Sequence, residues 1–161
     1  MGARSSHTVD PVVSRRYSSE SEAVLVVRRR PSMVNGGGFV VSNNKQQVVF
    51  RVDGCGVLGT KGKLLLTNGD GVNLLLIRKM ILSTHKSYVE IKGSFTERDC
   101  NIMNSDGRAI AKVRTDKEME EMVGNKTTDL YHVIVKPNVD QAFIIGLIAV
   151  LDYIHGESTI C

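Results

Sequence analysis

The sequence predicts a mainly β protein, in which an antiparallel sheet closes into a barrel around a hydrophobic C-terminal helix. Three observations predict this fold. Short apolar runs of strand length fill residues 22–136, tight Asn/Gly turns join several of them, and one longer run near the C-terminus is apolar around its whole circumference. A chain of 161 residues suits one domain, and with 42% hydrophobic but only 5% aromatic residues its core is expected to consist mostly of Val, Leu and Ile.

The N-terminal segment, residues 1–22, is rich in Ser and Arg and lacks apolar periodicity. We therefore expect a flexible tail there, one domain over residues 23–156 and a short tail at 157–161. No apolar region typical of a secretory signal follows the start. The opening MGARSS instead matches the pattern for N-myristoylation at Gly2. One myristoyl chain binds a membrane weakly, so a second, basic signal is expected beside it.

About nine segments have the length and composition of strands. They are residues 22–28, 38–42, 47–52, 63–67, 73–79, 88–94, 100–104, 109–114 and 131–136, with 80–83 (MILS) as a candidate tenth.

Polar turns at residues 42–46, 67–71 and 104–107 join neighbouring strands and contain the Asn and Gly residues that accept positive φ. Such a repeated strand and turn unit predicts an antiparallel meander. A sheet with one apolar face, followed by a helix that is apolar all round, predicts closure of the sheet around that helix. A flat sheet with the helix on one side is the alternative, and it would leave half of the helix in water.

The C-terminal run of ten apolar residues, 142–151, is too short to cross a membrane. As a helix it spans roughly 15 Å, whereas the hydrocarbon core of a bilayer is about 30 Å thick. Asp140 and Asp152 flank the run, and a carboxylate near a helix centre costs about 2.5 to 3.5 kcal/mol on insertion. We therefore predict a buried helix and no transmembrane span.

This core helix is expected over residues 138–155. Asn138 is placed to cap it, Gln141 to complete a capping box, and His155 with Gly156 to end it. The positions expected in the core share an apolar side chain: Ala142, Phe143, Ile144, Ile145, Leu147, Ile148, Val150 and Leu151.

No segment carries a complete catalytic or cofactor motif. Gly54, Gly56 and Gly59 form a G-x-G-x-x-G, but a further strand follows where a dinucleotide site needs the start of a helix. The three cysteines lack C-x-x-C spacing and the four histidines lack an H-x-x-x-H pair, which argues against a metal site and indicates free thiols in a reducing compartment. We expect no enzyme activity, no catalytic residue, no metal and no cofactor.

Charge is more informative. Lys and Arg exceed Asp and Glu by four, and the excess is clustered at residues 28–30, at Lys61 and Lys63, and at Arg78 and Lys79. Such clusters on a barrel suit the phosphates of lipid headgroups or of nucleic acid. Nucleic-acid modules usually add exposed aromatic residues, which are scarce here, so anionic lipid is favoured and no nucleic-acid contact is expected. A solvated surface without any ligand remains the alternative.

Six segments carry a family resemblance: VDPVV, GGFVV, VVFRVDG, NLLLIRKMILSTHK, IKGSFTERDCNI and, most specifically, VIVKPNVDQAFIIGLIAVLDYI. In this order they resemble the landmarks of plant LURP-one-related proteins, which share the tubby C-terminal-like fold. The resemblance implies a barrel of about twelve antiparallel strands threaded by the C-terminal helix. It also implies kinship with phospholipid scramblases and with tubby-like proteins, which bind phosphoinositides and act as membrane-tethered transcription regulators.

For the plant family the resemblance implies a link to defence, and it supplies no catalytic residues. We expect a cytoplasmic protein, peripheral at the plasma membrane and, by analogy with the family, present in the nucleus. Two functions stay open. One is a module that binds phosphoinositides or other anionic phospholipids; the other is a protein–protein interaction module of the defence response without a lipid ligand.

One departure from the family lies in the middle of the chain. About forty residues, enough for about three strands, are expected between the landmark LSTHK and Tyr88, whereas here Lys86, the last residue of the landmark, and Ser87 lead directly into Tyr88. Such a gap predicts exposed strand edges and a partly exposed helix. Either the chain folds poorly, or a partner closes the gap.

Overall fold

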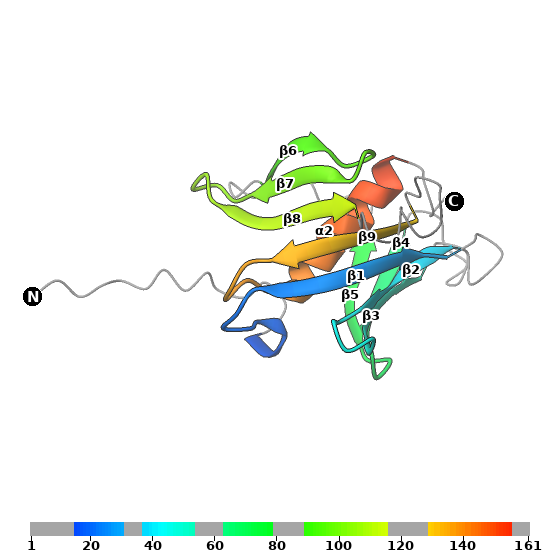
Figure 1. Cartoon of the computed structure of the whole chain (residues 1–161). Helices are drawn as coiled ribbons and strands as arrows, with labels where there is room; N and C mark the ends of the chain where they lie inside the picture. The colour runs from blue at the N-terminus through cyan, green and yellow to red at the C-terminus, as the bar shows by residue number, and fades with distance from the viewer. Residues whose placement is uncertain (1–14, 31–36, 54–62, 79–88, 116–128, 156–161) are drawn as a thin grey trace, which may run out of the picture.

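The computed structural model describes residues 15–30, 37–53, 63–78, 89–115 and 129–155. Within these ranges the chain forms a short 3-10 helix, one sheet and one α-helix (Figure 1). The elements are η1 (Arg15–Tyr17), β1 (Ala23–Arg29), β2 (Gly38–Ser42), β3 (Val48–Asp53), β4 (Lys63–Asn68), β5 (Asn73–Arg78), β6 (Glu90–Ser94), β7 (Asp99–Met103), β8 (Ala109–Thr115), β9 (Leu130–Val135) and α2 (Gln141–Ile154).

The nine strands pair in the order β5-β4-β3-β2-β1-β9-β8-β7-β6, and every pair is antiparallel. The first and last of the described strands, β1 and β9, therefore lie together at the centre of the sheet. Two meanders extend from this centre in opposite directions and end at β5 and β6. The mainly β, antiparallel class is confirmed, and each of the nine expected segments contains a strand. The candidate strand at 80–83 lies outside the described residues.

Three of the connecting turns are closed by the same type of hydrogen bond, from backbone N–H groups to an Asn side chain. The side-chain oxygen of Asn43 accepts hydrogen bonds from the backbone N–H groups of Lys45 and Gln47. Asn68 and Asn104 do the same for the residues two and four positions after each of them, at 2.9 to 3.0 Å. Because these bonds satisfy the turn backbone locally, an Asn after a strand fixes a tight return of the chain.

Burial alternates along the strands, as expected for a sheet with one face turned to the core. In β9, Tyr131, Val133 and Val135 are buried, while the residues between them are only half-buried. Val27 of β1 and Val41 of β2 are also buried and oppose each other in register. The core therefore lies on the side of the sheet that carries α2.

The predicted N-terminal tail extends too far in one respect. Tyr17, within η1, packs its ring 5.6 Å from that of Phe50 in the core. The backbone oxygen of Ser19 accepts a 2.7 Å hydrogen bond from the N–H of Asn138. Tyr17 and Ser19 are thus held against the folded domain, and residues 1–14, including Gly2, lie outside the described residues.

The helix begins later than predicted. Its N-cap is Asp140, whose Oδ1 accepts a 3.2 Å hydrogen bond from the N–H of Phe143. Asn138 was predicted to cap it, but Asn138 has a φ of 62° and belongs to the turn before the helix. The predicted end is close to the observed one, because the N–H of His155 donates to the carbonyl of Leu151 at 3.0 Å.

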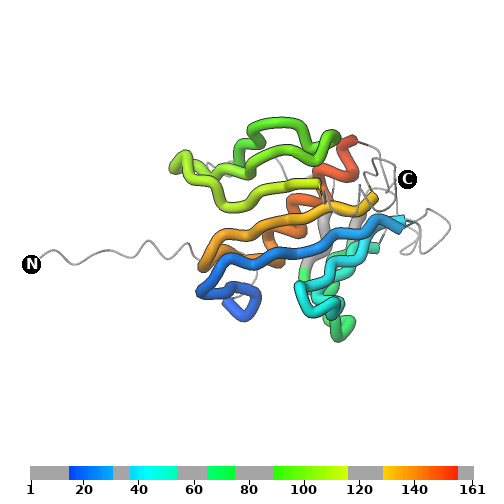
Figure 2. Tube along the Cα trace, viewed as in Figure 1, coloured from blue at the N-terminus to red at the C-terminus, as the bar shows by residue number. Residues whose placement is uncertain are grey.

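The sheet curls around α2, which lies behind β8 and β9 in the viewing direction that Figure 1 and Figure 2 share, and which packs against β3 and β5. Among the described residues it does not close, because β5 pairs only with β4 and β6 only with β7. The predicted closed barrel is therefore wrong for this part of the chain, and the structure is an open, curved sheet.

Because the sheet is open, only one side of α2 is completely buried. Ala142, Ile144, Ile145 and Ile148 are completely buried, as predicted. The remaining predicted core positions share partial exposure: Phe143, Leu147, Val150 and Leu151. Ile154 continues this stripe of the helix and is 62% exposed. In the described ranges, no helix is long and apolar enough to span a bilayer.

Candidate functional site

The outer face of the sheet, turned away from α2, gathers basic side chains that are far apart in the sequence. Which residues lie there follows from the alternation of burial. In β1, Leu25 and Val27 are buried, so Val24, Val26 and Arg28 lie on the outer face. The strand register then extends this assignment to the neighbouring strands.

One row of the outer face crosses five strands. Lys92 of β6 opposes Asn101 of β7, which opposes Lys112 of β8. Lys112 opposes Ile134 of β9, which opposes Val24 of β1. Neighbouring strands lie about 4.8 Å apart, so the backbones of the two lysines are about 10 Å apart. Lys92 is exposed and Lys112 is half-buried.

A second row crosses the other half of the sheet. Arg51 of β3 opposes Val40 of β2, which opposes Arg28 of β1. Both arginines are exposed, and the same strand spacing separates their backbones by about 10 Å. We call the four cations Arg28, Arg51, Lys92 and Lys112 the outer basic face.

None of these four cations forms an ion pair with another residue in the described part of the chain. A fifth cation between the two rows, Arg114, is held in place. Its Nη1 lies 3.3 Å from the carboxylate of Asp99, and its Nη2 donates to the side-chain oxygen of Asn101 at 2.9 Å. The outer basic face thus presents positive charge that the described protein does not neutralise by direct contact.

Apolar residues lie among these cations. Val24 is 40% exposed, and Val26, Val40 and Ile134 are half-buried. A surface that mixes exposed cations with aliphatic side chains differs from a purely solvated charged face. It matches the chemistry of the boundary between headgroups and acyl chains in an anionic membrane.

The structure describes only part of the basic clusters that the sequence predicts to bind headgroups. Lys63 and Arg78 oppose each other in register at the end of the β4–β5 hairpin, so the structure brings this pair together. Lys61 and Lys79 lie outside the described residues, and the predicted headgroup role of all four stays a prediction.

The cluster at residues 28–30 is divided. Arg28 belongs to the outer basic face, whereas Arg29 and Arg30 form ion pairs. Nη1 of Arg29 lies 3.0 Å from the carboxylate of Asp129, and Nη2 of Arg30 lies 2.7 Å from that of Asp53. Nε of Arg29 also lies 3.7 Å from the buried carboxylate of Asp152 in α2. Arg29 and Arg30 therefore connect strands and the helix, which makes them structural residues.

Arg51, Lys92 and Lys112 were missed because each stands alone in the sequence. Counting neighbouring charges finds clusters such as residues 28–30 but not cations that meet through strand register. The available signal was the period-two pattern of each strand, in which a cation alternates with buried residues. Using that signal also requires the strand order, which places β1 beside β9.

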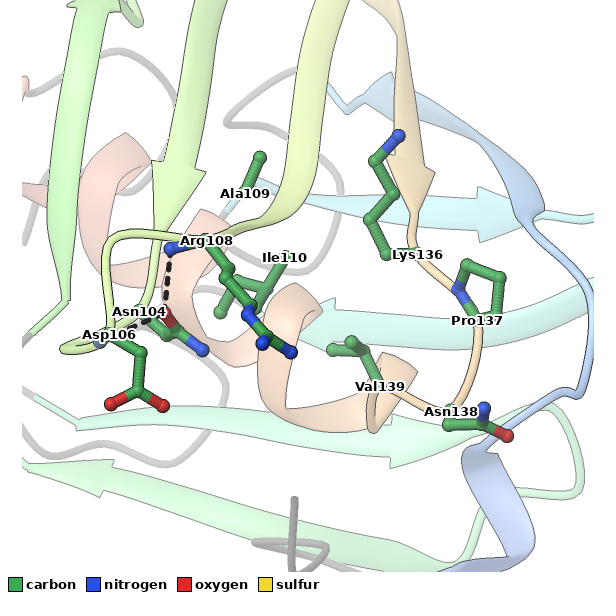
Figure 3. A pocket seen from close by; sticks show the side chains of 9 residues that line it. All are labelled: Asn104, Asp106, Arg108, Ala109, Ile110, Lys136, Pro137, Asn138 and Val139. Carbon is green, nitrogen blue, oxygen red and sulfur yellow. Dashed lines mark hydrogen bonds between the residues drawn. The ribbon is translucent and has the colours of Figure 1, made fainter. Parts of the chain in front are cut away.

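A separate hollow of about 480 Å³ opens at the turn between β7 and β8 (Figure 3). Arg108 reaches toward it from this turn, and Val139 lines it from the connection between β9 and α2. Asp106 lies on the same rim, and Lys136, also on the lining, has its ammonium 3.3 Å from the carboxylate of Glu22. Lys136 is thus paired, and Arg108 is the one cation of this lining without an ion pair among the described residues, compared with four such cations on the outer basic face.

The most deeply buried cation is structural. Arg98 is 0% exposed, and its guanidinium carbon lies 4.6 Å from the ring centre of Phe95 and 4.2 Å from that of Tyr131. Its Nη1 donates to the carbonyl of Phe95 at 3.2 Å. The Phe95 ring also stacks on His155 at 5.8 Å. Arg98 thereby holds the turn between β6 and β7 against β9 and the end of α2.

Other candidate chemistry is sparse in the described ranges. No group of three or more His, Cys, Asp or Glu residues there could hold a metal ion. Burial raises the pKa of the Cys100 thiol, which favours the protonated, unreactive form. His132 lies on the outer face of β9 opposite Arg114, without a neighbouring nucleophile in that row.

Comparison with known proteins supplies the family. The family model described as LURP-one-related matches residues 23–91 and 82–152. The chain is 63% identical to Protein LURP-one-related 16 of Arabidopsis thaliana over 216 aligned positions, covering 100% of both chains. It is 42% identical to Protein LURP-one-related 6 of the same plant, covering 93% of this chain and 98% of the relative. An X-ray structure of an Arabidopsis thaliana protein has a TM-score of 0.69 at 20% identity, over 89% of this chain and 98% of that one, which supports the fold.

These matches also locate a shortfall. The alignment with Protein LURP-one-related 16 has 216 positions and the chain has 161 residues, so at least 55 positions have no counterpart here. The two segments matched by the family model overlap at residues 82–91, a range that begins after β5 and ends within β6. This division of the match points to a shortfall between the two strands that form the edges of the open sheet, close to the place expected from the sequence.

Proposed function

Because the chain belongs to the plant LURP-one-related family, in which no catalytic residues are expected, we propose that it is a non-enzymatic module whose outer basic face binds anionic phospholipid headgroups at a membrane surface. The observation that carries this proposal is the register of the sheet. It places Arg28, Arg51, Lys92 and Lys112 on one face, and none of them pairs with a described acidic residue.

The magnitude of the attraction supports binding by several cations together. One Lys or Arg near an anionic leaflet contributes about 1 kcal/mol, and the contribution decays within a Debye length of about 8 to 10 Å. The two cations of each row are about 10 Å apart on the same side of the sheet, so they can approach a surface together, whereas cations on opposite faces cannot. The exposed Val24 adds apolar area at the same surface.

The mode of binding is peripheral. In this proposal α2 stays on the concave side of the sheet, and the outer face of the strands meets the lipid. N-myristoylation at Gly2 would supply the second signal that a weakly held acyl chain needs. Lys61, Lys63, Arg78 and Lys79 would extend the basic surface toward the β5 edge.

The proposed headgroup class, cellular location and biological role rest on the family resemblance. Kinship with tubby-like proteins and scramblases favours phosphoinositides as the headgroup class, a cytoplasmic protein at the plasma membrane with a nuclear pool, and a regulatory role in plant defence. The alternative is a protein–protein interaction module of the defence response without a lipid ligand, and it stays open.

Sedimentation with vesicles tests the proposal. Phosphatidylcholine vesicles with and without phosphatidylinositol bisphosphate are compared for the wild type and for two double variants, Lys92→Ala with Lys112→Ala and Arg28→Ala with Arg51→Ala. The matched control removes two exposed cations outside this face, Arg15 in η1 and Lys45 in the β2–β3 turn. We expect each outer-face double variant to weaken binding about tenfold or more, from two contributions of about 1 kcal/mol each, and the control to weaken it less. Equal losses in all three would contradict the proposed face.

Arg108→Ala separates the outer face from the hollow beside the β7–β8 turn. If the headgroup sits on the outer basic face, this substitution has the effect of one general charge. A loss larger than that of either outer-face double variant would place the headgroup in the hollow instead.

A further inference from the structure

The two edges of the sheet differ in how well they are protected from pairing with another strand. A strand edge carries unpaired N–H and C=O groups and is a template for a further strand unless charge, proline, a bulge or a covering segment prevents it. In the described residues the edges are β5 and β6, and the shortfall relative to the longer relatives falls between them.

The β6 edge is protected. Two of its five residues, Glu90 and Lys92, are charged and exposed. Gly93 has a φ of 108°, and a side chain there would collide with the backbone of Asp99. This backbone departs from the regular extended form that a partner strand needs.

The β5 edge is less protected. Its register with β4 shifts between Leu66 and Thr67, which leaves Leu74 as an extra residue near the start of the strand, whereas residues 75–78 pair regularly with β4. Its sequence, NLLLIR, has four consecutive aliphatic residues and no proline or glycine, and its only charge is the last residue, Arg78. A run with high strand propensity and a single terminal charge is typical of a segment that pairs with further strands. One edge of β5 is paired with β4, so among the described residues only its other edge has no strand partner.

The strand also suits a second copy of itself. In a two-fold antiparallel pair, opposed residues share a face, so one residue of the strand faces its own copy across the axis. A register centred on Leu75 would set Leu74, which lies at the register shift, opposite Leu76 of the copy. In the register centred on Leu76, Leu75 opposes Ile77 of the copy. Neither register places like charges opposite each other within the strand, and both place aliphatic residues together.

We propose that the chain forms a two-fold symmetric dimer through antiparallel pairing of β5 with β5 of a second copy. The occupant is a second copy because the edge is self-complementary. Since opposed residues share a face, the outer faces of the two copies would form one continuous surface. The proposed dimer does not depend on the proposed lipid binding. A dimer that does not bind lipid would still agree with this inference.

The first test measures mass in solution. Sedimentation equilibrium of the full chain over a dilution series is expected to give twice the 17.7 kDa of the monomer at high concentration and dissociation on dilution. Leu76→Lys places a lysine at or next to the axis in both registers and is expected to raise the dimer dissociation constant at least tenfold. Val24→Lys adds the same charge to the outer face of the central strand β1 and is expected to leave the dimer intact. A thermal melt of each variant checks folding.

The second test uses the unmodified chain, so it does not depend on a variant that folds. Hydrogen exchange of the amides in residues 73–78 is expected to slow as protein concentration rises, while that of residues 90–94 stays constant. Concentration-dependent protection of 90–94 alone would overturn the proposal in favour of the β6 edge. A monomer at every concentration would also overturn it, and fully protected β5 amides in such a monomer would show that the chain covers the edge itself.

Discussion

The guanidinium carbon of Arg98 lies 4.2 Å from the centre of the Tyr131 ring, with no part of the arginine exposed to solvent. A charged group at this depth is stable only because aromatic faces and hydrogen-bond acceptors replace its water. The contact joins the β6–β7 turn to the central strand β9. It thereby fixes one end of the sheet against the helix.

Arg98→Ala is expected to destabilise the fold by about 2 to 4 kcal/mol, because it removes two cation–π contacts and leaves a cavity. Chemical denaturation with a matched variant, Arg108→Ala in the exposed β7–β8 turn, measures the difference. The control is expected to change stability by less than about 0.5 kcal/mol. Equal losses would show that the buried site has no special role.

Asp140→Ala is expected to cost about 1 kcal/mol, since it removes the side chain that caps α2 at Phe143. Asn138→Gly is the matched test of the cap predicted from the sequence. Because Asn138 already has a φ of 62°, glycine fits its backbone and the change should be within a few tenths of a kcal/mol. A larger loss of stability for Asn138→Gly than for Asp140→Ala in urea melts would show that Asn138 caps the helix.

Gly93→Ala is expected to destabilise the protein more than Gly107→Ala. Both residues have positive φ, which alone costs about 1 kcal/mol for alanine. At Gly93 the new methyl would also collide with the backbone of Asp99 and Cys100, whereas nothing lies within 4 Å at Gly107. Thermal melts of the two variants compare these costs directly, and an equal shift would mean that the strand moves aside freely.

Cys100 predicts a pH dependence. Burial raises the pKa of its thiol above the ordinary value of 9.0, so the folded state prefers the protonated form. The stabilisation is fully present below the unfolded pKa and is lost as the pH rises toward the folded pKa. Wild-type protein should therefore lose stability above about pH 9 more steeply than Cys100→Ala, as measured by urea melts from pH 7 to pH 10. Parallel curves would contradict the assignment.

The strands could be predicted from the sequence because each is a short Val, Leu or Ile run bounded by a local signal. The oxygen of Asn43, Asn68 or Asn104 closes a turn within four residues, so sequence distance and spatial distance agree there. The mainly β class follows from this local regularity, whereas the family was indicated by the resemblance of six segments, of which the C-terminal one is the most specific.

Closure and the basic face could not be predicted in this way. Closure depends on pairing between strands that are distant in the sheet order, β5 and β6, and no local pattern encodes such pairing. The described sheet has two open edges, as the missing residues before Tyr88 predict, and not the closed barrel. Lys92 and Lys112 share a row only through the register of β6, β7 and β8. Asp140 and not Asn138 caps α2, because Asn138 has a positive φ and belongs to the turn before the helix. The residue type could not distinguish the two positions, since Asn occurs both in such turns and at helix N-caps.

The measurement that tests the central claim most directly is vesicle binding by the variant that reverses all four charges of the outer basic face, with glutamate at Arg28, Arg51, Lys92 and Lys112. The account predicts that wild-type protein binds phosphoinositide vesicles at low salt, binds them less as salt rises, and ignores neutral vesicles. The folded reversed variant is predicted not to bind. Undiminished binding by that variant, or wild-type binding that salt and headgroup charge leave unchanged, would contradict it.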